Sequence, residues 1–467
     1  MAKRVIVIGG GPGGYVAAIR AAQLGAEVHL VEAEKVGGTC LNVGCIPTKA
    51  LLHTAELYQE VKRGRSIGLL ADNVRVDWGL MQSRKQAVVN RLVKGVESLL
   101  KANKVTTHSG QGVLKDGRTV VIRTTAGETE LQADAVILAV GSEPVRIPFP
   151  GADLPQVVDS TAALSLPAVP TSLVILGGGV IGIEFAALYS ALGAEVTVVE
   201  MLPEILPGTD REMAVRLRQE LARHGVAFMT GAKLTAAAMR DGKVVATVDA
   251  GGTVKEVAGE YLLVAVGRRP RTSGIGLETA GVRTERGRII VDENFMTSVP
   301  GVYAVGDCNG EIMLAHAASA QGIAAVEHAL GHSPVYRRET IPACIYTNPE
   351  LAGVGITEER AAAENIAVKI GLFPLGGNGK AIIENGGAGL VKIIAGAKYG
   401  EVLGVHILGP RATDLIAEAA LAIRLEATVD ELISTIHAHP TVSEAMGEAA
   451  LAVRGEAIHW PPGMKVR

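Results

Sequence analysis

An internal repeat constrains the fold of this chain more than any other feature. The segment VIVIGGGPGG, which begins at Val5, recurs 168 residues later as LVILGGGVIG, which begins at Leu173. Each copy reads as a buried apolar strand, a G-x-G-x-x-G turn and an alanine-rich helix, and a second strand then ends in an acid, Glu32 or Glu200. One such motif is weak evidence, but two copies in the same register predict two dinucleotide-binding units.

The three glycines of each motif have separate physical roles. The first permits a tight turn, the second lets the backbone approach a pyrophosphate, and the third lets the helix pack closely on the strand. The pyrophosphate would lie at the helix N-terminus, where unpaired N–H groups and the helix dipole favour an anion. The acid is placed to bind a ribose hydroxyl. The candidate residues are Gly9, Gly11, Gly14 and Glu32 in the first unit, and Gly177, Gly179, Gly182 and Glu200 in the second.

A shorter repeat indicates where each unit ends. VILAVGSEP, from Val136, resembles LLVAVGRRP, from Leu262, and each is an apolar strand broken by glycine and proline. In isolation these could be ordinary core strands, but their positions behind the two units suggest crossings between domains. We therefore expect the second dinucleotide unit to be inserted within the first.

This reading divides the chain into four segments. Residues 1–144 begin the first domain, 145–268 form the inserted domain, 269–340 return to the first, and 341–467 form a mixed α+β domain without glycine fingerprints. The returning segment contains YAVGDCNG, in which Asp307 stands at a strand end and could accept a hydrogen bond from a ribityl hydroxyl. The predicted fold class is therefore α/β, with two Rossmann-like domains and a C-terminal α+β domain.

Half of the four cysteines lie in one segment, GGTCLNVGCIPTKA, which we expect to be a short loop that leads into a helix. The spacing of Cys40 and Cys45 fits neither zinc pattern of paired C-x-x-C units. A disulfide across so short a loop would restrict the unfolded chain little and stabilise the fold by only about 2 kcal/mol, so a structural role for the pair is poorly supported. A redox pair is favoured over two unrelated buried thiols, while Cys308 and Cys344 read as buried or incidental.

The residues after the cysteines support this interpretation. Pro47 suits the first turn of a helix, which would place Cys45 near a helix N-terminus that stabilises its thiolate. Lys49 lies one turn further along the same face and adds positive charge.

Composition excludes several function classes. The net charge is −3 and no basic block occurs, which argues against nucleic acid as a partner. No run of eighteen apolar residues is present, and the apolar run at Val5 is too short for a signal peptide. We expect a soluble cytosolic protein whose partners are small molecules and proteins. In a reducing cytosol, a cysteine pair is more often catalytic than structural.

The segment HAHPTVSEAMGEAA near the C-terminus contains His437, His439, Glu444 and Glu448. A metal site is one interpretation, but neither H-E-x-x-H nor further ligands are present, and we expect no metal. The second interpretation is a polar helix start. The third is an acid–base couple, in which His439 accepts a proton while Glu444 holds the other ring nitrogen. This segment alone leaves the last two open.

Together these segments resemble the flavin-dependent disulfide oxidoreductases. The resemblance covers nearly the whole chain, through GGGPGG, GGTCLNVGCIPTKA, GGGVIGIEFA, AVGRRP, AVGD and HAHPTVSEA. It implies FAD and NAD as cofactors, and a homodimer. The residues implied to bind FAD are Gly9, Gly11, Gly14, Glu32, Lys49, Gly141, Asp307 and Ala315. The residues implied to bind NAD are Gly177, Gly179, Val180, Gly182, Glu200 and Gly267.

The same resemblance implies catalytic roles. Cys40 would exchange with the substrate disulfide, and Cys45 would face the flavin and make a charge-transfer contact with it. Lys49 would lie near the flavin N5 atom and pair with Glu184. The base and its orienting acid, His439 and Glu444, would come from the other subunit.

Within the family, the sequence resembles the members that oxidise dihydrolipoyl groups with NAD⁺. NADPH-using relatives tend to carry alanine at the third glycine, tyrosine at the position of Val180, and arginines for the 2′-phosphate. Here Gly182, Val180 and Glu200 favour NAD, and the carboxylate would repel a 2′-phosphate. Mercuric reductases carry an extra C-terminal cysteine pair, whereas no cysteine follows Cys344.

The implied partner is a separate lipoyl-carrying protein of a 2-oxo acid dehydrogenase, acetoin dehydrogenase or glycine cleavage system. Two alternatives stay open: another disulfide reductase, similar to glutathione or mercuric reductase, and a flavoprotein subunit without turnover. One departure from the family concerns MLAHAASAQG, where Ala317 and small or polar residues replace a lysine and acids.

Overall fold

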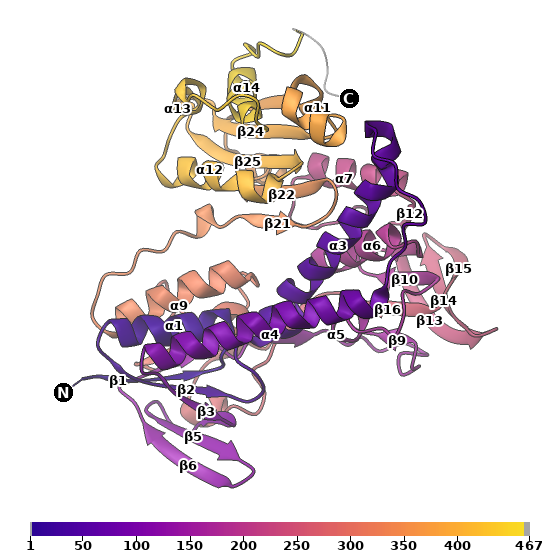
Figure 1. Ribbon diagram of the computed structural model, residues 1–467. Coiled ribbons are helices and arrows are strands. Elements are labelled where there is room, and N and C mark those ends of the chain that lie inside the picture. The colour runs from indigo at the N-terminus through magenta and orange to yellow at the C-terminus, as the bar shows by residue number, and fades with distance from the viewer. Residues whose placement is uncertain (1, 462–467) are drawn as a thin grey trace.

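The first copy of the repeat lies at the centre of a five-stranded parallel sheet. The computed structural model describes residues 2–461, so residues 1 and 462–467, at the outer ends of the first and last predicted domains, lie outside the described residues. The sheet has the order β20-β7-β1-β2-β3, and Figure 1 labels its strands β1, β2 and β3. Its strands are β1 (Arg4–Ile8), β2 (Glu27–Glu32), β3 (Thr106–Ser109), β7 (Ala135–Leu138) and β20 (Val302–Ala304), and all are parallel.

The second copy forms a similar sheet with the order β12-β11-β10-β16-β9. Its strands are β9 (Val157–Val158), β10 (Ser172–Leu176), β11 (Glu195–Val199), β12 (Val226–Met229) and β16 (Tyr261–Val264), again all parallel. Because β20 joins the first sheet only after this second sheet is complete, the second unit is inserted within the first.

The helix after each glycine turn packs on a different neighbour. Helix α1 (Pro12–Gln23) lies beside α9 (Ala315–Ala329), and their contact depends on small residues: a Cβ on Gly322 would lie 2.5 Å from the carbonyl oxygen of Gly13. Helix α6 (Val180–Ala191) instead meets α3 (Cys45–Arg63), which carries the second cysteine (Figure 1).

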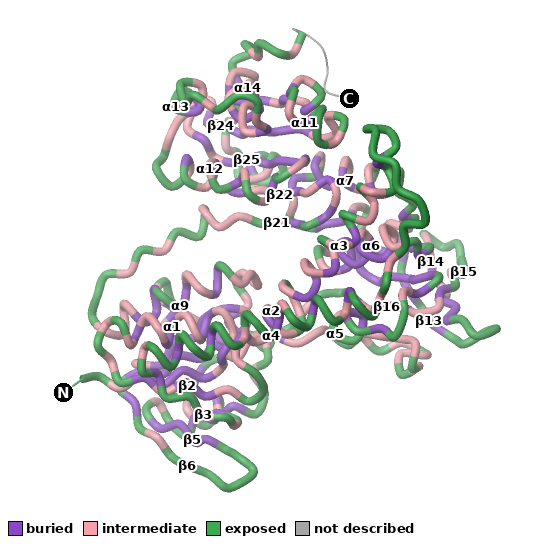
Figure 2. Tube along the Cα trace, viewed as in Figure 1, coloured by how far each residue is buried: buried purple, intermediate pink, exposed green. Residues whose placement is uncertain are grey.

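Long helices cover the first sheet, and short antiparallel ribbons flank both sheets. Between β2 and β3 stand α2 (Gly38–Val43), α3, the 3₁₀ turn η1 (Gly64–Ile67) and α4 (Trp78–Ala102). The first ribbon is β4 (Gln111–Leu114), β5 (Thr119–Thr124) and β6 (Gly127–Gln132), and the second is β13 (Ala232–Arg240), β14 (Lys243–Ala250) and β15 (Thr253–Gly259). Figure 2 shows the central strands of the two parallel sheets buried, whereas most of β6, most of β15 and the connection between α3 and α4 are exposed.

The ends of the two copies of the shorter sequence repeat form two short strands that pair with each other. β8 (Ser142–Pro144) and β17 (Arg268–Pro270) follow the strands β7 and β16 and pair antiparallel. The chain therefore leaves the first unit and re-enters it at one place. The remaining short elements before residue 341 are α5 (Ser160–Ala163), α7 (Arg211–Arg223), α8 (Leu277–Ala280), β18 (Thr284–Glu285), β19 (Arg288–Ile289), η2 (Gly306–Asn309) and η3 (Arg338–Thr340).

The C-terminal part is an antiparallel sheet with the order β21-β22-β25-β24-β23. The strands are β21 (Ala343–Ile345), β22 (Glu350–Gly355), β23 (Val368–Pro374), β24 (Leu390–Gly396) and β25 (Val402–Gly409), with helices α10 (Glu358–Ala363), α11 (Gly379–Asn385), α12 (Ala412–Arg424), α13 (Val429–Ser434) and α14 (Glu444–Val453) and the turn η4 (Leu375–Gly377). Side chains of α12 and α14 share one core with this sheet, and its other face packs on the second unit.

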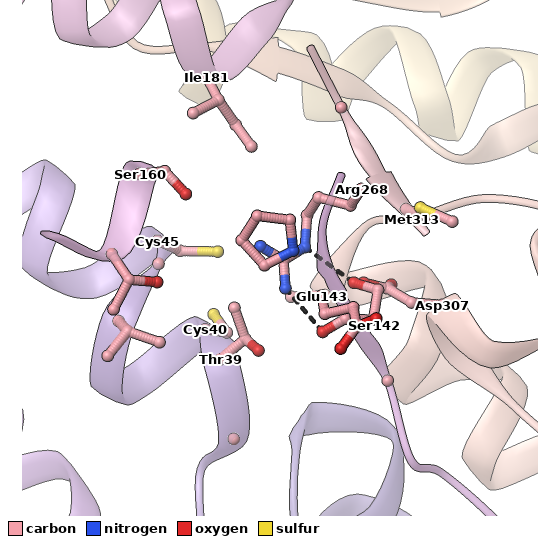
Figure 3. Close-up of a pocket in the computed structure, with 18 of the residues that line it drawn as sticks. Thr39, Cys40, Cys45, Ser142, Glu143, Ser160, Ile181, Arg268, Asp307 and Met313 are labelled. Atoms are coloured by element: carbon pink, nitrogen blue, oxygen red, sulfur yellow. Dashed lines mark hydrogen bonds between the residues drawn. The ribbon is translucent and has the colours of Figure 1, made fainter. Parts of the chain in front are cut away.

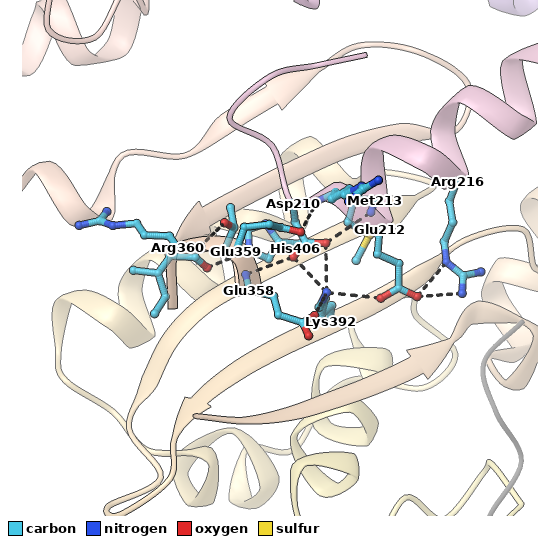
Figure 4. Close-up of polar contacts among 12 residues, drawn as sticks. Asp210, Glu212, Met213, Arg216, Glu358, Glu359, Arg360, Lys392 and His406 are labelled. Carbon is cyan, nitrogen blue, oxygen red and sulfur yellow. Dashed lines mark hydrogen bonds and ion pairs between the residues drawn. The ribbon is translucent and has the colours of Figure 1, made fainter. Parts of the chain in front are cut away.

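A charge cluster around the buried Lys392–Asp210 pair joins the second unit to this sheet (Figure 4). The side chain of Lys392, in β24, is 1% exposed, and its Nζ atom lies 3.0 Å from Asp210, the N-cap of α7, whose side chain is fully buried. Glu358 at 2.6 Å and Glu212 at 3.3 Å complete the set. Burial lowers the pKa of the neighbouring His406, so this ring is neutral at pH 7.

The predicted fold class is confirmed by this arrangement: two Rossmann-like sheets, the second inserted in the first, and a C-terminal α+β sheet. Among residues 2–461, no helix is both long enough and apolar enough to cross a membrane. Within the same range, no three histidine, cysteine or acidic side chains are grouped so as to hold a metal ion.

Candidate active site

One large cavity connects the two glycine turns with the cysteine pair. Its volume is about 3260 Å³, and Figure 3 shows Cys40 and Cys45 pointing into it from neighbouring helices. The predicted site residues on its wall are Gly9, Gly11, Glu32, Cys40, Cys45, Lys49, Gly141, Gly177, Gly179, Val180, Glu184, Glu200, Gly267, Asp307 and Ala315. The structure thus brings together predicted site residues from both nucleotide units, and Ala343, Cys344 and Ile345 of the C-terminal sheet also line the cavity.

The turn after β1 is shaped by its glycines. Gly9 has a φ of 100°, a value that favours glycine. A Cβ on Gly14 would lie 1.8 Å from the carbonyl oxygen of Gly9, so α1 can approach β1 only because residue 14 has no side chain. A Cβ on Gly11 would meet no atom closer than 3.8 Å. The N-terminus of α1 is therefore left uncovered, as an anion-binding helix end requires.

The turn after β10 repeats this geometry. Gly177 has a φ of 111°, and a Cβ on Gly182 would lie 2.1 Å from the carbonyl oxygen of Gly177. A Cβ on Gly179 would meet nothing within 4 Å. Helix α6 begins at Val180, which is 42% exposed on the cavity wall. Each unit therefore offers an open helix N-terminus to the same space.

The two acids at the strand ends brace their own turns. Glu32 accepts the N–H of Gly10 at 2.6 Å, and Glu200 accepts the N–H of Gly178 at 2.6 Å. The other carboxylate oxygen of each accepts the N–H two residues further along, at 2.8 and 2.7 Å respectively. Both acids also reach the cavity wall. The sequence predicted a ribose contact for each acid but did not predict this bracing.

Cys40 and Cys45 lie on two consecutive helices, so the predicted single loop is wrong. Helix α2 holds Cys40, and Gly44 alone separates it from α3, whose first residue is Cys45. Glycines at positions 37 and 38, which sequence patterns count against helix, start α2 with positive φ angles. The start of α3 agrees with the position of Pro47, and it puts the Cys45 sulfur near the unpaired N–H groups of a helix N-terminus.

The two thiols differ in acidity. Both are free thiols in the structure. The hydrogen bond from the Cys40 thiol, together with the Lys49 ammonium, outweighs burial and lowers the pKa of Cys45 to about 7. The same hydrogen bond raises the pKa of Cys40, and burial adds to the effect. Cys45 is therefore the member of the pair that carries negative charge near neutral pH.

Lys49 reaches across from α3 to a buried carboxylate on α6. Its Nζ atom donates to both oxygens of Glu184, at 2.8 and 2.7 Å. The Glu184 side chain is 5% exposed. Burial raises the pKa of Glu184, while the Lys49 ammonium and the N–H of Tyr346, at 3.1 Å, act in the opposite direction. The pair predicted from the resemblance is thus in contact, and Tyr346 is an additional partner that the sequence did not predict.

Arg268 is a second residue that the sequence analysis missed. It extends into the cavity between the cysteines and Asp307 (Figure 3). Its guanidinium donates to the Ser142 hydroxyl at 2.8 Å and to the Ser142 carbonyl at 2.7 Å, and that hydroxyl donates to Asp307 at 2.5 Å. The shorter sequence repeat could have indicated this contact, because Ser142 and Arg268 occupy the same position in its two copies, AVGSEP and AVGRRP.

His439 and Glu444 form a couple away from this cavity. The Nδ1 atom of His439 lies 2.9 Å from Glu444, whose other oxygen accepts the N–H of Thr441 at 2.9 Å. These hydrogen bonds outweigh partial burial and lower the pKa of Glu444. The His439 side chain is 80% exposed and is not part of the cavity wall. Glu448 instead pairs with His459 at 2.7 Å.

The small residues of MLAHAASAQG have a packing reason. Ala317 is fully buried in α9, and a Cβ on Gly13 of α1 would lie 3.2 Å from the carbonyl oxygen of Ala318. Longer side chains would separate the two helices. The buried Gln321 from this segment accepts the N–H of Gly306 at 2.7 Å, which supports the turn that carries Asp307.

Two family models match this chain. Residues 3–322 match pyridine nucleotide-disulphide oxidoreductase, and residues 341–450 match the dimerisation domain of the same family. The chain belongs to the pyridine nucleotide-disulphide oxidoreductase family. This confirms the resemblance inferred from the sequence, and it places the exposed His439–Glu444 couple in the part that matches the family's dimerisation domain.

Individual members of this family are similar to the chain over nearly its whole length. Dihydrolipoyl dehydrogenase 3 of Pseudomonas putida is 45% identical over 97% of this chain and 98% of its own length. Dihydrolipoyl dehydrogenase of Thermus scotoductus is also 45% identical, with the same coverage. Among solved structures, LpdA from Mycobacterium tuberculosis superposes with a TM-score of 0.90 at 30% identity, over 96% of this chain and 99% of that one.

Proposed function

We propose that this oxidoreductase is a dihydrolipoyl dehydrogenase, which oxidises the dihydrolipoyl group of a carrier protein to lipoyl and reduces NAD⁺ to NADH. The observation that carries this proposal is the position of Cys40 and Cys45 in one cavity with both glycine turns. The relatives at 45% identity that carry this enzyme name support the choice of substrate. FAD and NAD are the cofactors of this enzyme class.

The residues present fit these two cofactors. Each glycine turn leaves an uncovered helix N-terminus for a pyrophosphate, and each has an acid at the adjacent strand end for a ribose. We assign FAD to the first unit, with Gly141, Asp307 and Ala315, and NAD to the second, with Val180 and Gly267. When bound, the flavin would accept two electrons from the thiolate side and supply hydride to the nicotinamide.

The chain's own contribution is the thiol chemistry. A dihydrolipoyl thiolate attacks the Cys40 sulfur of the oxidised pair, the bond between Cys40 and Cys45 breaks, and Cys45 leaves as a thiolate. The second dihydrolipoyl thiol then displaces Cys40, which closes the lipoyl disulfide and leaves the pair reduced by two electrons. The lowered pKa of Cys45, about 7, suits it as the leaving group and as the charge that faces the flavin.

The Lys49–Glu184 pair holds a positive charge beside this thiolate. Glu184 holds the Lys49 ammonium through two hydrogen bonds, so the positive charge of Lys49 stays near Cys45. We propose that Lys49 also contacts the flavin.

The base that removes the substrate protons is His439, and Glu444 orients it. Its exposure and its absence from the cavity wall favour a site completed by a second copy of the chain, which would present its own His439 to Cys40. A subunit-exchange experiment tests this. Mixing inactive Cys40→Ser chains with inactive His439→Gln chains should restore activity toward half the wild-type value per mixed dimer. Mixed dimers without activity would put the base in its own chain.

The proposed division of the chain follows from these roles. Residues 1–144 and 269–340 bind FAD, residues 145–268 bind NAD, and residues 341–467 form the dimer interface. The lipoyl carrier is a protein of a 2-oxo acid dehydrogenase, acetoin dehydrogenase or glycine cleavage system. A cytoplasmic location fits the use of NAD⁺.

An activity panel tests the function. The purified protein, loaded with FAD, should oxidise dihydrolipoamide with NAD⁺ and should reduce glutathione disulfide with NADPH at least about a hundredfold more slowly, since Glu200 opposes the 2′-phosphate. The reverse preference would make it a glutathione-reductase-like enzyme. Activity with neither pair would favour a flavoprotein subunit without turnover.

A further inference from the structure

Tyr346 connects the C-terminal sheet to the charge pair beside the cysteines. It directly follows β21, within the part of the chain that matches the dimerisation domain. The Nζ atom of Lys49 lies over its ring, 4.6 Å from the centroid. Its backbone N–H donates to Glu184 at 3.1 Å. One residue of the C-terminal part therefore contacts both members of an ion pair that belongs to the two nucleotide units.

Two groups contact the Lys49 ammonium. The carboxylate of Glu184 accepts hydrogen bonds from it, and the negative face of the Tyr346 ring, which attracts a cation, lies close to it. The Lys49 side chain is 29% exposed, so it would otherwise have room to turn toward water. The tyrosine hydroxyl takes part in neither contact. The ring and the backbone, not the acidic proton, carry the interaction.

Charged and titratable groups on four neighbouring elements, α2, α3, α6 and β17, act on the Cys45 thiol. Lys49 on α3 is favourable to the thiolate, Glu184 on α6 is unfavourable, and Cys40 on α2 donates a hydrogen bond. Arg268 on β17 adds positive charge within reach of Cys45. Burial raises the pKa of Tyr346 to about 12, so its ring is neutral here. Among these groups, Lys49 is the cation that the Tyr346 ring contacts.

We propose that Tyr346 is a positioning residue: its ring and its N–H hold the Lys49–Glu184 pair so that the ammonium stays beside the Cys45 thiolate. The C-terminal sheet thereby contributes to the reactivity of a thiol that lies on the first unit. This inference rests on the proposed role of Cys45 as the thiolate that faces the flavin.

The test measures the acidity of Cys45 alone. In a Cys40→Ser background, the FAD-loaded protein should show long-wavelength absorption that titrates with the Cys45 thiolate. Tyr346→Leu removes the ring face and should shift the midpoint upward by about half a pH unit, the size expected from a lost cation–π contact. Tyr346→Phe keeps the ring and should leave the midpoint unchanged. The rate of iodoacetamide reaction against pH, measured on the same FAD-loaded protein, should show the same shift.

Two controls distinguish positioning from general loosening. Tyr399→Leu removes a ring that lies 4.5 Å from the Lys398 ammonium at an exposed turn, and it should not move the midpoint. Lys49→Met should raise the midpoint, and Tyr346→Leu added to Lys49→Met should raise it no further, because Tyr346 acts through Lys49. If Tyr346→Leu does not fold, Tyr346→Met removes the ring with less change in shape.

The outcomes separate this inference from the proposed function. A titrating band with no shift in Tyr346→Leu, or an equal shift on the Lys49→Met background, would overturn the role of Tyr346 and leave the function intact. No titrating band in any Cys40→Ser protein would overturn the role of Cys45, and with it the proposed function.

Discussion

The two dinucleotide units have nearly the same backbone but different neighbours. Both turns place the first glycine at a φ near 100° or 111°, and both strand-end acids accept the N–H of the second residue of the turn at 2.6 Å. Yet position 16 on α1 is Val16, whereas the equivalent position on α6 is Glu184. That carboxylate meets Lys49 of α3, on the helix that begins with Cys45.

This difference shows how one repeated unit acquires two roles. The glycine turn supplies a nucleotide-binding cradle in both copies, because the backbone geometry alone creates it. The helix that follows is free to differ, and its outer face decides which partner it takes. Helix α1 uses small residues to pack on α9, and α6 uses an acid to join the charge pair beside the thiols. The second unit is also the one whose Asp210 is bonded to Lys392 of the C-terminal sheet.

The largest expected effect comes from breaking that attachment. Lys392→Met should cost about 3–5 kcal/mol of unfolding free energy, because it leaves the fully buried Asp210 carboxylate without its cation. Urea unfolding measures the loss. Lys380→Met removes an exposed pair with Glu384 on α11 and should cost less than about 0.5 kcal/mol. Equal losses in the two variants would mean that the buried cluster does not fasten the second unit.

The next effect separates the two strand-end acids. Glu200→Ala should weaken NAD⁺ binding by roughly 1.5–3 kcal/mol, the worth of a charged hydrogen bond, and should lessen the rejection of NADP⁺. Glu32→Ala is the matched change in the first unit and should weaken FAD retention without altering the ratio of kcat/KM for NAD⁺ and NADP⁺. The assignment of nucleotides to units fails if Glu32→Ala changes that ratio and Glu200→Ala does not.

The smallest effect concerns pH. Because the pKa of Cys45 is lowered to about 7, the thiolate is present above that pH and is lost as the pH falls through it. Long-wavelength absorption of the two-electron-reduced protein should follow the same curve. The Cys40 variants are read without added reductant, because a lone Cys45 thiolate faces oxidised flavin and added electrons would reduce the flavin itself. Cys40→Ala, which removes the hydrogen-bond donor, should raise the midpoint by about one pH unit, whereas Cys40→Ser retains a donor and should raise it less. If the midpoint is the same in the wild-type protein and in both Cys40 variants, the hydrogen bond from Cys40 is not the cause of the lowered pKa.

Features that depend on local backbone geometry could be predicted from the sequence. The turns at Gly9 and Gly177 need glycine for their φ angles, and the apolar strands before them are buried, so sequence and structure agree there. The inserted topology also followed from the order of the repeats. The position of Pro47 predicted a helix N-terminus near Cys45, although not that α3 would include Cys45 itself.

Features that depend on distant contacts could not be predicted in this way. Helix α2 was missed because its glycines carry a turn signal. Lys392 stands in an apolar strand with no acidic residue beside it in that strand, and only the fold brings it to Asp210, far away in the sequence. The contact of Tyr346 with Lys49 joins residues nearly three hundred positions apart. The two residues of each of these contacts come together only when the sheets pack.

The central claim is that the cysteine pair is the route from dihydrolipoyl groups into a cavity shared by both units. Anaerobic mixing of the FAD-loaded Cys45→Ser protein with each reductant tests it directly. NADH should bleach the flavin absorption at close to the wild-type rate, dihydrolipoamide should bleach it at least about a thousandfold more slowly, and a Cys344→Ser control should respond to both. Rapid bleaching of Cys45→Ser by dihydrolipoamide would contradict the claim, because electrons would then reach the flavin without the pair.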